Sequence, residues 1–164
     1  MKNILWAAPI AVLLMLCTAE SGAQNKPAGS DQSKLMVAWT GTWQQKRGKD
    51  TVEVWKIKQF GKSFTMDVYL EIKGKKTHLR KNNFIFSPEE GKFKGFQLYF
   101  DGYYDTWIGS FSGEKKFSLE ITQNFIPGST IYKYDMIMET PDSFTLTRFE
   151  NGVKVKDSRF KKEK

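Results

Sequence analysis

Arg148 is the residue whose type and position point most directly to binding chemistry. It follows Phe144 and Leu146 at intervals of two residues, so strict strand alternation turns its side chain towards an apolar face. A buried guanidinium is costly unless an anion meets it, and that anion would be a ligand carboxylate or Glu150 on the same face. A register shift near the turn at Asn151-Gly152 would turn Arg148 outward instead. The pattern leaves both directions open.

A carboxylate and a phenol share a face in the most aromatic segment of the chain, residues 96–111. Tyr103, Asp105 and Trp107 alternate there, so Asp105 could lie beside Tyr103. Such a pair could move protons at a bound ketone or enol, which makes the two residues weak catalytic candidates. Aromatic pairs across strands are also ordinary stabilisers of sheets. The balance favours a protein that is not an enzyme, with an isomerase, cyclase or hydratase as the alternative.

Metal and thiol chemistry have little material in this chain. His78 is the single histidine and Cys17 the single cysteine, so one chain cannot build a multi-histidine metal site. One imidazole could still ligate haem, but a haem ligand needs apolar surroundings, whereas Lys76 and Arg80 flank His78. The sequence therefore predicts an exposed strand histidine, no metal site and no cofactor.

The N-terminus has the pattern of a secretory signal peptide. Lys2 provides a positive start, residues 4–17 are almost wholly apolar, and Ser21-Gly22-Ala23 offers small side chains for cleavage. A lipoprotein signal would place a small residue before Cys17, where this chain has Leu16, so lipid anchoring is not expected. The apolar stretch is shorter than the roughly 20 residues that span a bilayer. We expect a secreted or periplasmic protein without a transmembrane segment, and a mature chain without disulfides.

The rest of the chain divides into a leader and one domain. After the signal peptide (1–23), residues 24–33 are polar and predict a flexible leader. Residues 34–164 predict a single domain, which opens with a short helical turn and then alternates amphipathic strands with turn signals about every ten residues. About nine or ten strands with uniformly short connections predict an all-β fold, a single antiparallel up-and-down barrel rather than a sandwich.

The start of the domain carries a family resemblance. Trp39-Thr40-Gly41-Thr42-Trp43 resembles the opening strand of lipocalin-like (calycin) barrels, and residues 102–107 are similar to a hairpin of uncharacterised secreted bacterial lipocalin-like domains. In that family a glycine permits a tight entry, a tryptophan packs across the closed end, and an arginine or lysine from the last strand covers the tryptophan. The resemblance implies these structural roles for Gly41, Trp43 and Arg159.

The barrel interior and the charged exterior suggest different partners. A closed barrel can enclose one small molecule or fill with side chains. The net charge of +8 attracts anionic partners, but the lysines are scattered, which favours a solvated outer face and no nucleic acid partner. We expect a monomer or dimer that binds a small apolar or amphipathic ligand, which could be anionic. An interaction protein with a basic surface and a solid core is the alternative. The candidate ligand-binding residues are Arg148, Tyr132, Tyr134, Met136, Phe64, Met66 and Phe117.

Overall fold

The computed structural model describes residues 32–126 and 128–164, which form one short helix and ten strands. The signal peptide predicted for residues 1–23, and all but the last two residues of the leader predicted for 24–33, lie outside the described residues. The elements in chain order are α1 (Gln32–Val37), β1 (Gly41–Gly48), β2 (Thr51–Phe60), β3 (Ser63–Ile72), β4 (Lys75–Ser87), β5 (Lys92–Tyr99), β6 (Tyr104–Gly113), β7 (Lys116–Thr122), β8 (Tyr132–Thr140), β9 (Ser143–Glu150) and β10 (Val153–Lys162).

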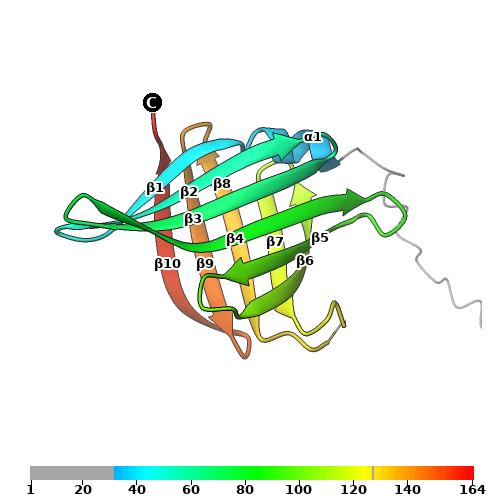
Figure 1. Cartoon of the computed structure of the whole chain (residues 1–164). Helices are drawn as coiled ribbons and strands as arrows, with labels where there is room; N and C mark the ends of the chain where they lie inside the picture. Colours follow the sequence, from blue (N-terminus) through cyan, green and yellow to red (C-terminus); the bar gives the residue numbers. More distant parts are fainter. Residues whose placement is uncertain (1–31, 127) are drawn as a thin grey trace, which may run out of the picture.

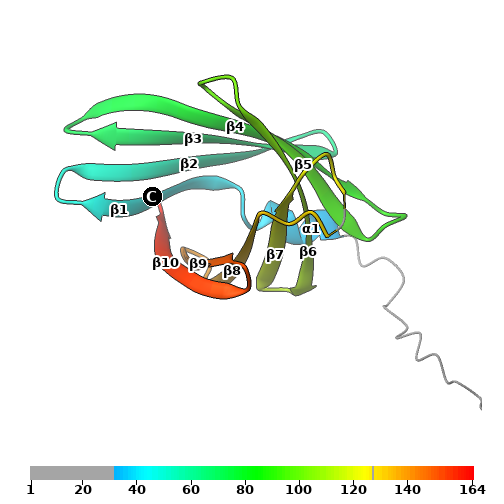
Figure 2. The same cartoon turned by 90° about the horizontal axis from the view of Figure 1, so that it is seen from below.

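Each strand pairs with its neighbour in the sequence, and the last strand pairs with the first. The pairings are antiparallel, and Trp43 opposite Lys162 joins β1 to β10 and closes the sheet. Figure 1 shows the closed sheet from the side, and Figure 2 shows it from below. Closure pairs the backbone groups that an open sheet would expose at its edges. The predicted all-β fold, a single antiparallel up-and-down barrel, is confirmed with ten strands.

The helix α1 covers one end of the barrel. Figure 1 shows it at the end opposite the loops that connect β7 to β8 and β9 to β10. Met36 and Trp39 are buried, and the Trp39 ring lies 5.2 Å from the Phe144 ring. The side chain of Gln32 accepts a hydrogen bond from the Phe111 backbone N–H (3.0 Å), which ties the helix to β6. The short helix that the sequence predicted therefore plugs this end.

Aromatic side chains fill the part of the barrel next to α1. Phe144 and Phe160 stack with ring centroids 4.7 Å apart, and Trp43 meets Phe144 edge-on at 4.9 Å. From β3 and β5, Phe64 and Phe93 meet edge-on at 6.3 Å. All five side chains are fully buried. Dense packing of large rings stabilises this end strongly, because each ring removes a large apolar area from water. We call these five residues the aromatic cluster.

Gly41 and Trp43 lie where β1 enters the closed end. Gly41 has a φ of 128°, and a Cβ there would lie 2.6 Å from the Lys162 side chain, so the position requires glycine. The cation over Trp43 is Lys162, whose ammonium lies 5.1 Å from the ring centroid, and this corrects the expectation for Arg159. Phe160 points inward, so alternation turns Arg159 outward, where its side chain is 63% exposed.

Two glycines make room for aromatic side chains inside the barrel. A Cβ at Gly95 in β5 would overlap the indole ring of Trp107, its partner in β6. A Cβ at Gly109 would lie 2.7 Å from the Phe117 ring. Neither glycine has a positive φ, so space rather than backbone conformation explains both.

Replacement of Gly95 by alanine should lower the free energy of unfolding by about 1–3 kcal/mol, because the added methyl group forces the Trp107 ring to move. Gly113→Ala at the end of β6 is the matched control, since its added Cβ meets no heavy atom of the described residues within 4 Å. Urea-induced unfolding followed by tryptophan fluorescence measures both. Equal unfolding free energies for the two variants would contradict the role assigned to Gly95.

Candidate functional site

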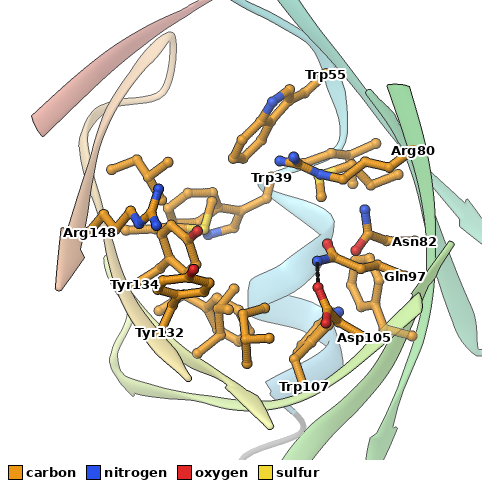
Figure 3. A pocket seen from close by; sticks show the side chains of 18 of the residues that line it. Trp39, Trp55, Arg80, Asn82, Gln97, Asp105, Trp107, Tyr132, Tyr134 and Arg148 are labelled. Carbon is orange, nitrogen blue, oxygen red and sulfur yellow. Dashed lines mark hydrogen bonds between the residues drawn. The ribbon is translucent and has the colours of Figure 1, made fainter. Parts of the chain in front are cut away.

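The barrel encloses a cavity of about 330 Å³ beside the aromatic cluster. Small-molecule sites in proteins span roughly 300–1,000 Å³, so the cavity suits a compact ligand. Figure 3 shows side chains from opposite walls of the barrel pointing into it. Aromatic, aliphatic and methionine side chains make up its apolar wall. These are Met36, Trp39, Trp55, Ile57, Met66, Phe84, Trp107, Phe117, Leu119, Ile121, Met136 and Leu146.

Polar side chains line the other part of the cavity. Figure 3 shows those from β8 and β9 facing those from β4, β5 and β6. Along β8, the order Tyr132, Tyr134, Met136 runs towards the part of the strand that pairs with Phe144 of the aromatic cluster. The polar groups therefore lie farther from α1 than the apolar wall does, and the cavity is amphipathic. The polar lining residues are Arg80, Asn82, Gln97, Tyr99, Asp105, Tyr132, Tyr134 and Arg148.

Arg148 points into the cavity, which is one of the two directions that its sequence position left open. It lies opposite Tyr134 in the register of β8 and β9. Its guanidinium carbon is 4.2 Å from the Tyr132 ring centroid, and its Nη2 pairs with Glu150 Oε1 at 2.5 Å. Arg148 Nε has no hydrogen-bond partner among the described residues. Glu150 is thus the protein anion for this guanidinium, and one N–H remains for another acceptor.

Arg80 brings a second guanidinium into the cavity from β4. Its Nη2 lies 3.9 Å from Oε1 of Glu53, a carboxylate that is almost fully buried. Glu53 Oε1 also accepts a hydrogen bond from Trp55 Nε1 (2.8 Å), and Glu53 Oε2 pairs with Arg47. Arg47 is therefore the close ionic partner of Glu53, and Arg80 lies at a longer distance from the same carboxylate.

Four buried nitrogen donors in the cavity wall have no hydrogen-bond partner within residues 32–126 and 128–164. Asn82 is 1% exposed, and its Nδ2 is one of the four. The others are Nε of Arg80, Nε of Arg148 and Nε1 of Trp39. A buried donor left unpaired costs about 1–3 kcal/mol, so a ligand that brings acceptor oxygens would stabilise each of them. The cavity is therefore suited to accept oxygen atoms at its polar end.

Arg80 and Asn82 were missed at the sequence level, although a signal existed. Both continue the inward phase of Phe84 and Phe86 along β4, at intervals of two residues. The basic residues around His78 suggested a wholly exposed segment, whereas alternation places every second side chain inside. Gln97 follows the same rule in β5, two residues after Gly95, and it is 6% exposed.

Asp105 lies in the cavity wall, but the phenol beside it is Tyr99. Asp105 Oδ2 accepts hydrogen bonds from the Tyr99 hydroxyl and from Gln97 Nε2, both at 3.0 Å. Tyr103 is 74% exposed in the turn between β5 and β6, which corrects the expected pair. The strand alternation begins only at Tyr104, so Tyr103 does not share the inward face. Asp105 and Tyr99 could exchange a proton with a ligand. The Tyr99 hydroxyl and Gln97 Nε2 both bond to Oδ2 of Asp105, so Oδ1 is the oxygen without a hydrogen bond from either of them.

Burial favours the protonated form of two cavity phenols, those of Tyr99 and Tyr134. Burial raises the pKa of Tyr99 to about 12, the charge of Arg80 opposes the rise, and Asp105 adds to it. Burial also raises the pKa of Tyr134, against the opposing charges of Arg148 and Arg80. Both hydroxyls therefore remain protonated at neutral pH and can serve a ligand as hydrogen-bond donors.

The structure places most of the predicted ligand-binding residues in the cavity wall. Phe64 is the exception, because it belongs to the aromatic cluster and stacks on Phe84 at 5.5 Å. The predicted residues that do line the cavity are Met66, Phe117, Tyr132, Tyr134, Met136 and Arg148.

His78 lies on the outer side of β4. It pairs with Tyr69, on which its ring stacks at 4.9 Å, and its Nε2 is 3.3 Å from Asp67 Oδ1. A ligand inside the barrel is therefore out of its reach. Within the part of the chain that the structure describes, no three His, Cys, Asp or Glu residues form a group that could hold a metal ion.

Comparison with known proteins leaves the cavity to be interpreted from its own residues. No protein-family model matches the chain, and no curated protein matches its sequence. In residues 32–126 and 128–164 there is no helix with the length and apolar character needed to cross a bilayer.

An ultraviolet titration of phenolate absorbance should show a late step near pH 12, and Tyr99→Phe should remove one tyrosine from it. The folded protein holds this proton more tightly than an unfolded chain, whose tyrosine pKa is 10.0. The stability that Tyr99 contributes is therefore full below pH 10 and is lost as the pH rises towards 12. Tyr103→Phe is the control, because that ring is exposed. An unchanged late step in Tyr99→Phe would contradict the assignment.

Proposed function

We propose that this protein is a lipocalin-like carrier that binds one small amphipathic molecule inside its barrel. The observation that carries the proposal is the set of three unpartnered buried donors at the polar end of the cavity, on Arg80, Asn82 and Arg148. The closed antiparallel barrel and the placement of Gly41 and Trp43 support the lipocalin-like assignment. The N-terminal signal pattern supports export to the periplasm or the exterior.

The apolar wall fits the body of such a ligand. Trp39, Trp55 and Trp107 offer broad flat surfaces, and Met36, Met66 and Met136 can adjust to the shape of the ligand because their side chains are unbranched. Burial of apolar surface supplies the main driving force for a ligand of this kind, about 25 cal/mol per Å².

A carboxylate is the head group that the polar wall fits best. It offers two oxygens, each able to accept more than one hydrogen bond, to Nε of Arg80, Nε of Arg148 and Nδ2 of Asn82. Arg80 is only loosely paired with Glu53 at 3.9 Å, whereas Glu150 pairs closely with Arg148 and leaves its Nε free of a partner among the described residues. Hydrogen bonds to charged groups contribute about 1.5–3 kcal/mol each, more than those between neutral groups.

Decanoate and decan-1-ol, which share a chain and differ in the head group, test the carboxylate assignment. Quenching of tryptophan fluorescence reports binding, because three tryptophans line the cavity. Arg148→Gln should weaken decanoate binding by about 10- to 100-fold and leave decan-1-ol binding nearly unchanged. Arg159→Gln, on the outer surface, should change neither. An equal loss for both ligands in Arg148→Gln, or no loss, would refute a carboxylate seat at this residue.

Filling the cavity tests whether binding takes place inside the barrel. Leu146→Trp adds bulk to the cavity wall and should reduce the affinity for both ligands at least tenfold, since the ligand and the indole compete for one space. Ile137→Trp on the outer face of β8 is the matched control, because Ile137 is 44% exposed. Circular dichroism checks that each variant is folded. Undiminished binding by folded Leu146→Trp would favour the alternative of a surface interaction protein.

A further inference from the structure

The positive charge of the chain is concentrated in one part of the barrel. Residues 41–81 contain eleven lysines and arginines against four aspartates and glutamates, whereas residues 82–164 contain twelve of each. The excess charge of the barrel therefore belongs to β1, β2, β3 and the first half of β4. These four strands are consecutive neighbours in the closed sheet, so the charges lie on one continuous stretch of the surface.

Apart from Arg47, the exposed cations of this stretch are lysines. Arg47 is paired with the buried Glu53, and Arg80 points into the cavity, so neither arginine is available to a large external partner. We call the exposed lysines the basic face. Its members are Lys46, Lys49, Lys58, Lys62, Lys73, Lys75, Lys76 and Lys81.

Two hairpin turns present part of the basic face away from the barrel. Figure 1 shows the turns between β1 and β2 and between β3 and β4 projecting together at the left. The backbone N–H of Lys73 donates to the carbonyl of Asp50 (2.9 Å), which joins the two turns. Lys49, Lys75 and Lys76 stand on these turns or next to them, and all three are exposed. The projection lets several charges reach a flat surface at once.

Exposed apolar side chains accompany the lysines. Ile72 ends β3 next to the projecting turn and is 48% exposed. Phe60, at the opposite end of the β2–β3 pair between Lys58 and Lys62, is 77% exposed. An apolar side chain among lysines is typical of proteins that lie on a lipid surface, where lysines meet the anionic head groups and apolar groups enter the acyl boundary.

We propose that the basic face docks on an anionic lipid bilayer. Lysines act as point charges and suit the diffuse field of anionic head groups, whereas binding of a nucleic acid backbone favours the bidentate geometry of arginine, which this face does not offer. The exposed Phe60 and Ile72 have no role in binding a soluble polyanion. The proposal stands independently of ligand binding in the cavity, although a carrier docked on a bilayer could exchange an amphipathic ligand there.

Sedimentation with lipid vesicles tests the docking. The protein should bind vesicles that mix phosphatidylglycerol with phosphatidylcholine, and it should not bind vesicles of phosphatidylcholine alone. Binding should weaken steeply as the salt concentration approaches 1 M, where the screening length falls to about 3 Å. Absence of binding to the anionic vesicles at low salt would overturn the proposal.

Two variants that lose equal charge locate the docking surface. Replacement of Lys49, Lys75 and Lys76 by glutamine should lower the vesicle partition coefficient by about 100-fold, since each lysine near an anionic surface contributes about fivefold. The control replaces Lys115, Lys133 and Lys156, which are exposed outside the basic face, and should lower it only a few-fold. Equal losses of vesicle binding in the two triple variants would show that net charge alone drives binding, and would refute the basic face as the docking surface.

Comparison of binding to vesicles with binding to soluble polyanions distinguishes the two kinds of partner. Ile72→Ser should weaken vesicle binding several-fold, because Ile72 is an exposed large apolar side chain next to the projecting turns. Tighter binding of duplex DNA or of a sulfated polysaccharide than of vesicles, unaffected by Ile72→Ser, would assign the face to a soluble polyanion instead. Decanoate binding should be the same in all of these variants, so failure of docking and failure of the carrier proposal give different results.

Discussion

The pairing of β1 with β10 is the contact on which the enclosed interior depends. It is a short ladder, in which Trp43 lies opposite Lys162 and the Glu163 N–H donates to the Thr42 carbonyl at 2.8 Å. Side chains reinforce this seam, because Lys162 covers the Trp43 ring and Phe160 is fully buried beside it. Without this closure the sheet would have two free edges, and the cavity would lose a wall.

Within the closed sheet, packing and binding are divided between two parts of the interior. The aromatic cluster and α1 fill one part, and dense packing there leaves no room for a ligand. The other part keeps charged side chains, of which Glu53 is buried and therefore costly unless it is paired. Glu53 pairs with Arg47 and lies near Arg80, and Glu150 pairs with Arg148. These pairs hold two guanidiniums in the cavity wall while leaving an Nε donor of each unpaired.

The two-residue period of a strand lets the inside and the outside of the barrel serve different purposes. In β4, Arg80 and Asn82 line the cavity, whereas Lys81 between them belongs to the basic face. A change on one face therefore leaves the other face in place. β4 therefore contributes to the basic face and also supplies two cavity donors that have no partner within the described residues, Nε of Arg80 and Nδ2 of Asn82. A docked barrel would hold this part of its binding wall close to the bilayer.

The sequence by itself determined the all-β class, the short helix, the up-and-down order and the faces of the most regular strands, because turn residues and period-two alternation are local properties. Tertiary structure decided which side chains meet. Lys162 rather than Arg159 covers the tryptophan of the closed end, and Tyr99 rather than Tyr103 contacts Asp105, since these neighbours belong to different strands, whose relative register no single segment encodes. The presence of the cavity also depends on the tertiary structure, because its volume is set by how completely the large rings from many strands fill the barrel interior.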